Sequence, residues 1–143
     1  MKRSVLLVLF LALVAVPVSA SDHDLDHDPS LEFAQVTWVD VTARADGTYA
    51  FAVTVRHDDA GWDHYADAWE VVDPRTDAVL ATRELLHPHE TEQPFTRSLD
   101  GVVVPEGVTV VLVRARCNVH GFGGRTVTID LSEPEGEGYT VGR

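Results

Sequence analysis

The sequence predicts an all-β protein, with the fold class of an immunoglobulin-like antiparallel β-sandwich of about seven strands. Two observations lead to this prediction. Short runs rich in valine, threonine and aromatic residues recur along the chain, and clusters of Gly, Pro and Asp separate them. No helical period of useful length follows the first twenty residues. The chain differs from antibody domains in lacking their paired cysteines, because Cys117 is the only cysteine in the chain.

The first twenty residues have the organisation of an export signal. Lys2 and Arg3 precede an apolar run over residues 5–16, and small residues follow up to Ala20. We therefore expect a signal peptide over residues 1–20 and a periplasmic or secreted product. The apolar run is short for a transmembrane helix, and no cysteine follows it to carry a lipid. The mature protein is expected to keep no stable membrane anchor.

Residues 21–32 are polar and acidic, which is typical of a flexible arm. If cleavage falls after Ala20, His23 is third from a free amino terminus. An amine, amides and an imidazole arranged in this way can bind Cu(II) or Ni(II) in a square plane. A solvated run of charges explains the same residues without a metal.

Seven runs after the arm have the composition of strands. The second has the clearest pattern, because Phe51, Val53 and Val55 alternate with small or polar residues, as in a half-buried strand. The strands are expected over residues 33–44, 49–56, 65–72, 79–86, 95–99, 108–116 and 125–131. Together they predict one domain over residues 33–132, followed by a loose Gly- and Glu-rich tail over residues 133–143.

All the histidines map to one end of such a sandwich. Successive strands run in opposite directions, so the loops after the second, fourth and sixth strands lie at the same end, beside the start of the first. Neutral imidazole and thiolate are donors that transition metals prefer. The pattern therefore predicts a site for copper, iron or zinc, and a solvated or hydrogen-bonded histidine rim is the alternative. The candidate ligands are His57, His64, His87, His89, Cys117 and His120.

Neighbouring residues of these loops have two possible roles each. The carboxylates could orient the imidazole rings or could simply be loop polarity; they are Asp58, Asp59, Asp63 and Glu90. The aromatic residues could shield the site or complete the core; they are Trp62, Tyr65, Phe95 and Phe122. Cys117 cannot form an intrachain disulfide, so it is expected to be buried, paired with another chain or bound to a metal.

The charge of the chain excludes some partners. The formal net charge is -12, and removal of the signal with Lys2 and Arg3 would leave -14. Such an acidic protein is not expected to bind nucleic acid or anionic lipid through charge. The acidic surface could attract cations, or could serve solubility alone.

The order of these motifs resembles the superoxide reductase family, which includes neelaredoxin and the iron-centre domain of desulfoferrodoxin. The resemblance covers roughly residues 53–122, and its most specific element is Cys117-Asn118-Val119-His120-Gly121. The resemblance implies an immunoglobulin-like sandwich and an iron ion held by histidines and one cysteine. It carries over His57, His64, Cys117 and His120 as iron ligands. The family's Glu-Lys-His-x-Pro element has no counterpart here, and Lys2 is the only lysine in the chain.

Three functions remain open at this point. The first is an exported protein that binds copper or zinc for buffering, delivery or tolerance. The second, implied by the resemblance, is an iron enzyme that reduces superoxide to peroxide at an open coordination position. The third is a β-sandwich interaction module without a metal, and the sequence does not name an electron donor or a protein partner.

Overall fold

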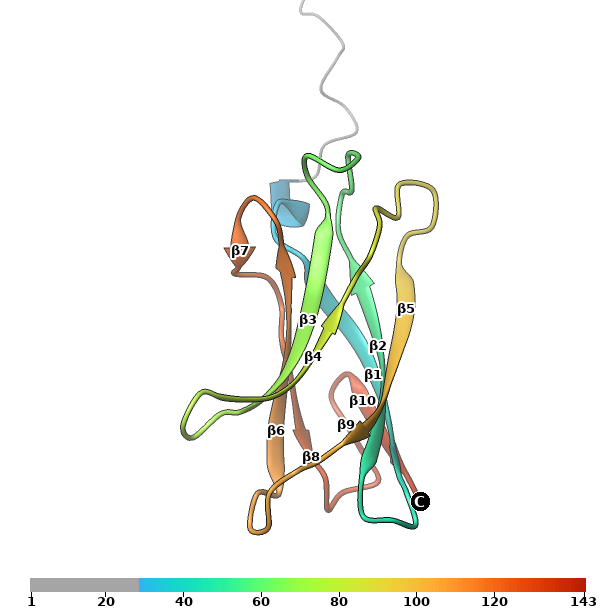
Figure 1. Ribbon diagram of the computed structural model, residues 1–143, viewed down its shortest axis with the longest axis vertical. Helices are drawn as coiled ribbons and strands as arrows, with labels where there is room; N and C mark the ends of the chain where they lie inside the picture. Colours follow the sequence, from blue (N-terminus) through green and yellow to red (C-terminus); the bar gives the residue numbers. More distant parts are fainter. Residues whose placement is uncertain (1–28) are drawn as a thin grey trace, which may run out of the picture.

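The structure is a computed structural model, and it describes residues 29–143. In this part of the chain two five-stranded sheets pack face to face (Figure 1), so the prediction of an all-β sandwich is confirmed. The predicted signal peptide and most of the predicted arm, with His23 and His27, lie outside the described residues. Among residues 29–143 no helix is long and apolar enough to cross a membrane.

A short 3-10 helix, η1 (Pro29–Leu31), precedes the strands. The first sheet has the order β5 (Phe95–Val102), β2 (Tyr49–Arg56), β1 (Gln35–Ala43), β10 (Tyr139–Gly142) and β9 (Glu135–Gly136). The second sheet has the order β4 (Ala78–Glu84), β3 (Ala66–Asp73), β6 (Val110–Cys117) and β7 (Gly121–Phe122), and β8 (Val127–Asp130) also pairs with β6. The edge strands β4 and β5 contact each other across the sandwich.

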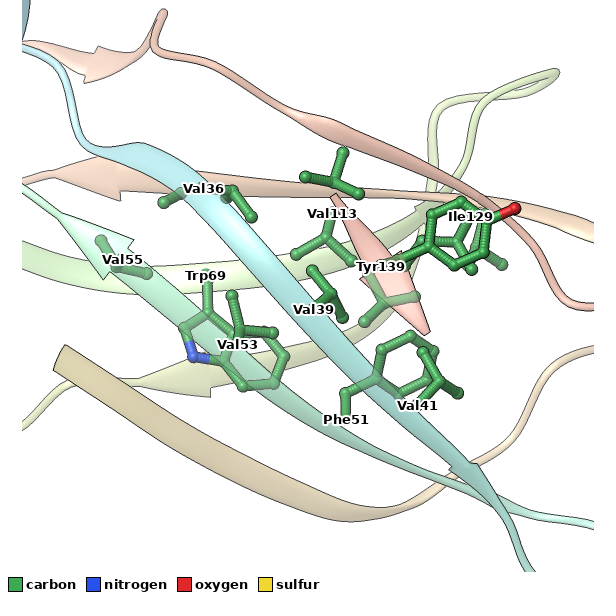
Figure 2. Close-up of a cluster of buried hydrophobic side chains, with 14 of the residues drawn as sticks. Val36, Val39, Val41, Phe51, Val53, Val55, Trp69, Val113, Ile129 and Tyr139 are labelled. Atoms are coloured by element: carbon green, nitrogen blue, oxygen red, sulfur yellow. The ribbon is translucent and has the colours of Figure 1, made fainter. Parts of the chain in front are cut away.

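Alternation along the strands places the core between the two sheets. Phe51, Val53 and Val55 of β2 are fully buried, as their period-2 spacing predicts. They face Trp69 of β3 and Val113 of β6 across the interior (Figure 2). Burying an aliphatic or aromatic side chain of this kind stabilises the fold by about 1.5–3 kcal/mol.

The prediction of a loose tail over residues 133–143 was wrong. Strand β10 pairs with β1 in parallel and aligns Tyr139 with Val39 and Val141 with Val41. Tyr139 and Val141 are buried, so they add apolar surface to the core. The seven predicted strands correspond to β1–β6 and β8, with ends shifted by a few residues, and β7, β9 and β10 were not predicted.

The strand directions bring three loops to one end of the sandwich. These loops follow β2, β4 and β6, and they lie at the top of Figure 1 beside the start of the described chain. The five histidines among residues 29–143 lie on or next to these loops, as does Cys117 at the end of β6. The predicted gathering of histidines at one end is therefore observed for the described residues.

Candidate metal centre

Three of the predicted ligands come together at this end. The ligand atoms of His57, His64 and Cys117 all lie within 4.8 Å of one another. His57 directly follows β2, His64 lies two residues before β3, and Cys117 ends β6. Pairing of Ala66 with Cys117 in neighbouring strands sets the spacing of the last two. Two ligands that bind one ion at 2.0–2.3 Å are separated by roughly 3.0–4.5 Å, so only small movements are needed to close this group on an ion.

His120 completes the cluster through the turn after β6. Its Nδ1 lies 3.5 Å from Cys117 Sγ, and its backbone N–H donates a hydrogen bond of 3.0 Å to the same sulfur. A thiolate and an imidazole that share a tetrahedral ion lie about 3.5 Å apart. Gly121 allows the turn with a φ of 71°, which L side chains rarely adopt, and pairs with Cys117 to start β7.

Asn118 lies between Cys117 and His120 in the sequence, and its side chain forms two hydrogen bonds with the loop that carries His64. Its Oδ1 accepts a hydrogen bond of 2.9 Å from the Tyr65 N–H, and its Nδ2 donates one of 3.0 Å to the Trp62 carbonyl. Both partners flank His64, so Asn118 holds the His64 loop beside the Cys117 turn. The Cys-Asn-x-His spacing is the strongest signal in the sequence, but nothing in the sequence indicated this role for Asn118.

A buried carboxylate, Asp59, orients His57. The side chains of both residues are fully buried, and His57 Nδ1 lies 2.6 Å from Asp59 Oδ1. A carboxylate can only accept here, so Nδ1 donates the hydrogen, and Nε2 is the ring atom that could bind a metal. Asp59 also accepts the backbone N–H groups of Ala66 at 3.0 Å and of His89 at 2.6 Å. Asp59, one of the loop carboxylates named above, therefore orients a candidate ligand.

Two pKa values report this environment. Burial raises the pKa of Asp59, but the hydrogen bonds from His57, His89 and Ala66 outweigh it, so the carboxyl pKa lies below its usual value. Burial lowers the pKa of His64, and the neighbouring rings of His57 and His120 lower it further. The two directions favour a charged Asp59 carboxylate and a neutral His64 imidazole, and a neutral imidazole is the form that binds a transition metal.

The backbone carbonyl of Glu32 faces the same cluster. Its oxygen lies 2.9 Å from His120 Nδ1, 3.3 Å from His57 Nε2 and 3.5 Å from Cys117 Sγ. A carbonyl oxygen has two lone pairs and donates nothing, so its three neighbours share these lone pairs when they donate to it. Within residues 29–143, the Nε2 atom of His64 is also buried without a hydrogen-bond partner. A cation among these atoms would be bound by lone pairs of the imidazoles, the thiolate and the carbonyl, and this donor set fits copper, zinc or iron.

His87 and His89 do not belong to this three-residue group. Their rings lie 4.5 Å apart and line a separate pocket of about 100 Å³, together with Arg83 and Arg97. His89 is buried and stacks on Phe95, with ring centroids 3.8 Å apart, whereas His87 is exposed. Two guanidinium cations make this pocket a poor place for a further cation.

The aromatic residues of this end have different roles. Phe95 belongs to the core, while Trp62 is 64% exposed and contacts Tyr65 edge to face. Phe122 is also exposed, and the guanidinium of Arg114 lies 4.4 Å from its ring centroid. His120 is exposed as well, so the cluster is open to solvent on the side of the β6–β7 turn.

The fold and the site define a class of protein: a β-sandwich with histidine and cysteine donors gathered at one end. No family model matches the chain. A curated protein of Halomicrobium mukohataei, described as "Putative lipoprotein", is 44% identical over 114 residues, which cover 78% of this chain and 55% of that protein. This chain thus spans about half the length of the relative that it matches.

Among solved structures, the chain is similar to a member of the family that its motifs resemble. This structure is superoxide reductase (1Fe-SOR) from Giardia intestinalis, with a TM-score of 0.41 and 15% sequence identity. The similarity covers 68% of this chain and 99% of that chain.

His89 makes the stability of the metal-free protein sensitive to acid. Burial lowers the pKa of His89, and the neighbouring charges of Arg97 and His87 lower it further. A histidine in the unfolded chain has a pKa of about 6.5, so below that pH the unfolded state binds the proton more tightly than the folded state. The contribution of His89 to the free energy of unfolding is therefore expected to be fully present above pH 6.5. This contribution should be lost as the pH falls through the pKa of His89 in the folded protein.

Urea denaturation of the metal-free protein at pH 8 and pH 5 measures this loss. His89→Phe keeps a ring against Phe95 and should show a smaller loss than the wild type. His87→Ala removes one of the charges that lower the pKa of His89, so its loss of stability should lie between those of the wild type and His89→Phe. Equal losses in the wild type and in His89→Phe would contradict the prediction.

Proposed function

We propose that this chain is an exported metal-binding protein that holds copper or zinc for buffering, delivery or tolerance. The observation that supports it most is the convergence of His57, His64 and Cys117, whose ligand atoms lie within 4.8 Å of one another. His120 is the fourth proposed ligand, through its Nδ1 atom 3.5 Å from the sulfur. Asp59 supports the proposal because it orients His57 as carboxylates orient the histidines of metal sites.

The donor set decides between classes of ion. Magnesium and calcium prefer oxygen ligands, whereas imidazole and thiolate suit copper, zinc and iron. Two histidines and one cysteine near a backbone oxygen are the ligand types of copper electron-transfer sites. Three histidines and one cysteine are equally suited to a tetrahedral zinc site. Copper and zinc are therefore the first candidates.

An iron protein of the superoxide reductase kind is the second candidate. The Cys117-Asn118-Val119-His120 motif favours it, and so does the nearness of Cys117 to three histidines. An iron ion in this centre would supply one-electron redox chemistry. His87 and His89 line a different pocket, so no fourth histidine is at hand among residues 29–143. Elemental analysis of the protein purified from its native host separates iron from copper and zinc.

Export is part of the proposal. The first twenty residues have the organisation of a signal, and the relative from Halomicrobium mukohataei is described as "Putative lipoprotein", a class that is exported. The cysteine of this chain is buried in the cluster rather than near the predicted cleavage position. We therefore propose a periplasmic or secreted protein, without a lipid on Cys117.

A zinc titration with matched histidine variants tests the proposed function. Wild type is expected to bind one zinc ion, and a thousandfold excess over the dissociation constant should stabilise the fold by about 4 kcal/mol. His64→Ala removes a donor at the cluster and should weaken binding at least about tenfold. His87→Ala removes an exposed imidazole outside the cluster and should leave the affinity unchanged.

Competition against a chelator gives the affinities, and thermal melting gives the stabilisation. If zinc, copper and iron all leave the melting temperature unchanged, the metal-binding proposal is wrong and the metal-free interaction module is favoured. If His64→Ala and His87→Ala bind equally well, the ligands lie elsewhere in the chain.

A further inference from the structure

We propose that the backbone carbonyl oxygen of Glu32 is a ligand of the metal, which rests on the proposed function of the cluster. The segment that carries it, residues 29–35, is called the strap. It enters the described chain through η1 and leads into β1, and it crosses the end of the sandwich where the donors converge (Figure 1).

The distances around the Glu32 oxygen match those between ligands of one ion. Cis ligands at about 2.1–2.3 Å from a metal are separated by roughly 2.9–3.6 Å. The oxygen lies 2.9 Å from His120 Nδ1, 3.3 Å from His57 Nε2 and 3.5 Å from Cys117 Sγ. All three distances therefore lie within the range expected between ligands of one ion.

The orientation of the His57 ring turns its Nε2 atom toward the carbonyl. His57 Nδ1 lies 2.6 Å from Asp59 Oδ1, so Nε2 is the ring atom that faces the Glu32 oxygen, 3.3 Å away. A cation between the two atoms would use the lone pair of Nε2 and a lone pair of the carbonyl oxygen.

The strap is held in place by packing and by hydrogen bonds of its own. The Nε2 atom of Gln35 donates to the carbonyls of Ser30 at 2.7 Å and Phe33 at 2.9 Å. The Phe33 ring lies 5.7 Å from the His120 ring and packs so closely on Gly123 that a Cβ at Gly123 would overlap with it. Glu32 is thus presented to the cluster by neighbours on both sides.

Carbonyl-selective NMR tests the ligand directly. The dipeptide Glu32-Phe33 is the only Glu-Phe pair in the chain, so labelling with carbonyl-13C glutamate and 15N phenylalanine gives one signal for the Glu32 carbonyl. Glu70-Val71 is the only Glu-Val pair, and glutamate with 15N valine gives a control signal in β3. The probe is zinc alone, added to the purified metal-free protein.

Ligation draws electron density from the oxygen, so the Glu32 carbonyl carbon should move downfield with the stoichiometry of zinc binding. Loss of the His120 hydrogen bond without ligation would move it upfield instead. The control signal should stay in place. An upfield or unchanged Glu32 signal, while zinc binds in a His64-dependent way, overturns this inference and leaves the proposed function intact. If zinc, copper and iron all fail to bind, the proposed function itself fails.

A double-mutant cycle gives a second measurement that needs no label. Gly123→Ala should push the Phe33 ring and the strap away from the cluster and weaken zinc binding about tenfold. Phe33→Ala removes the ring with which the added Cβ at position 123 would overlap. The double variant should therefore have the same zinc affinity as Phe33→Ala alone. Additive losses in the cycle would show that Gly123 acts without the strap, and would count against the inference. Melting of the metal-free variants checks that each one folds.

Discussion

Replacing Asp59 by alanine is expected to lower the free energy of unfolding of the metal-free protein by about 3–5 kcal/mol. The carboxylate is fully buried, and it accepts hydrogen bonds from the His57 ring and from the backbone of Ala66 and His89. Alanine leaves all three donors buried without an acceptor. Zinc affinity should also fall about 10–100-fold, because the His57 ring loses the group that orients it.

Urea denaturation and zinc titration of the same variant separate these two effects. Asp63→Ala is the matched control, because Asp63 is an exposed carboxylate of the same loop, and its removal should change stability by no more than about 0.5 kcal/mol. Asp59→Asn keeps an acceptor and should fall between the wild type and Asp59→Ala. A loss below about 1 kcal/mol in Asp59→Ala would mean that water replaces the carboxylate.

The strands that could be predicted are those with long alternating runs. In β2 the inward residues Phe51, Val53 and Val55 are separated by small or polar ones, and the prediction of residues 49–56 agrees with the structure. Strand β10 has only Tyr139 and Val141 as inward residues, within a segment rich in Gly and Glu. Its stability comes from pairing with β1, a contact about a hundred residues away that no local pattern reports.

The site could be predicted in outline because strand direction alone assigns each loop to an end. Strand direction assigns His57, His64, Cys117 and His120 to one end, where the structure also has them. Strand direction does not separate them from His87 and His89, because sheet order decides which loops of one end are neighbours. Strands β3 and β6 pair in the middle of the second sheet, whereas β4 lies at its edge.

The Glu32 carbonyl could not have been predicted in the same way. A backbone carbonyl oxygen is present in every residue type, so the amino-acid sequence does not show which carbonyl lies near the cluster. The nearest signal in the sequence is Gly123, where the missing side chain makes room for Phe33. Only the packing of the strap on the β7 region brings the carbonyl to the donors.

Replacing Cys117 by serine is expected to weaken zinc binding by about 10²–10³-fold. The free energy of zinc binding at structural sites with four ligands is about 10–16 kcal/mol at neutral pH, which is roughly 3 kcal/mol for each ligand. Cys117 is 1% exposed, and its sulfur lies near His120 Nδ1 and the Glu32 carbonyl, so no other thiolate can take its place. Serine has a similar shape but stays protonated near neutral pH and is a poor ligand.

Cys117→Ser should also remove the charge-transfer absorption of the metal-loaded protein. Thiolate bound to Cu(II), Fe(III) or Co(II) gives charge-transfer absorption because these ions have partly filled d shells, whereas Zn(II) with its filled shell gives none in the visible. Cobalt(II) is the cleaner probe, since it does not oxidise the thiol. We expect cobalt-loaded wild type and His87→Ala to share an intense band that Cys117→Ser lacks. If Cys117→Ser keeps both the band and the affinity, the cysteine is a core residue and the centre is made of histidines alone.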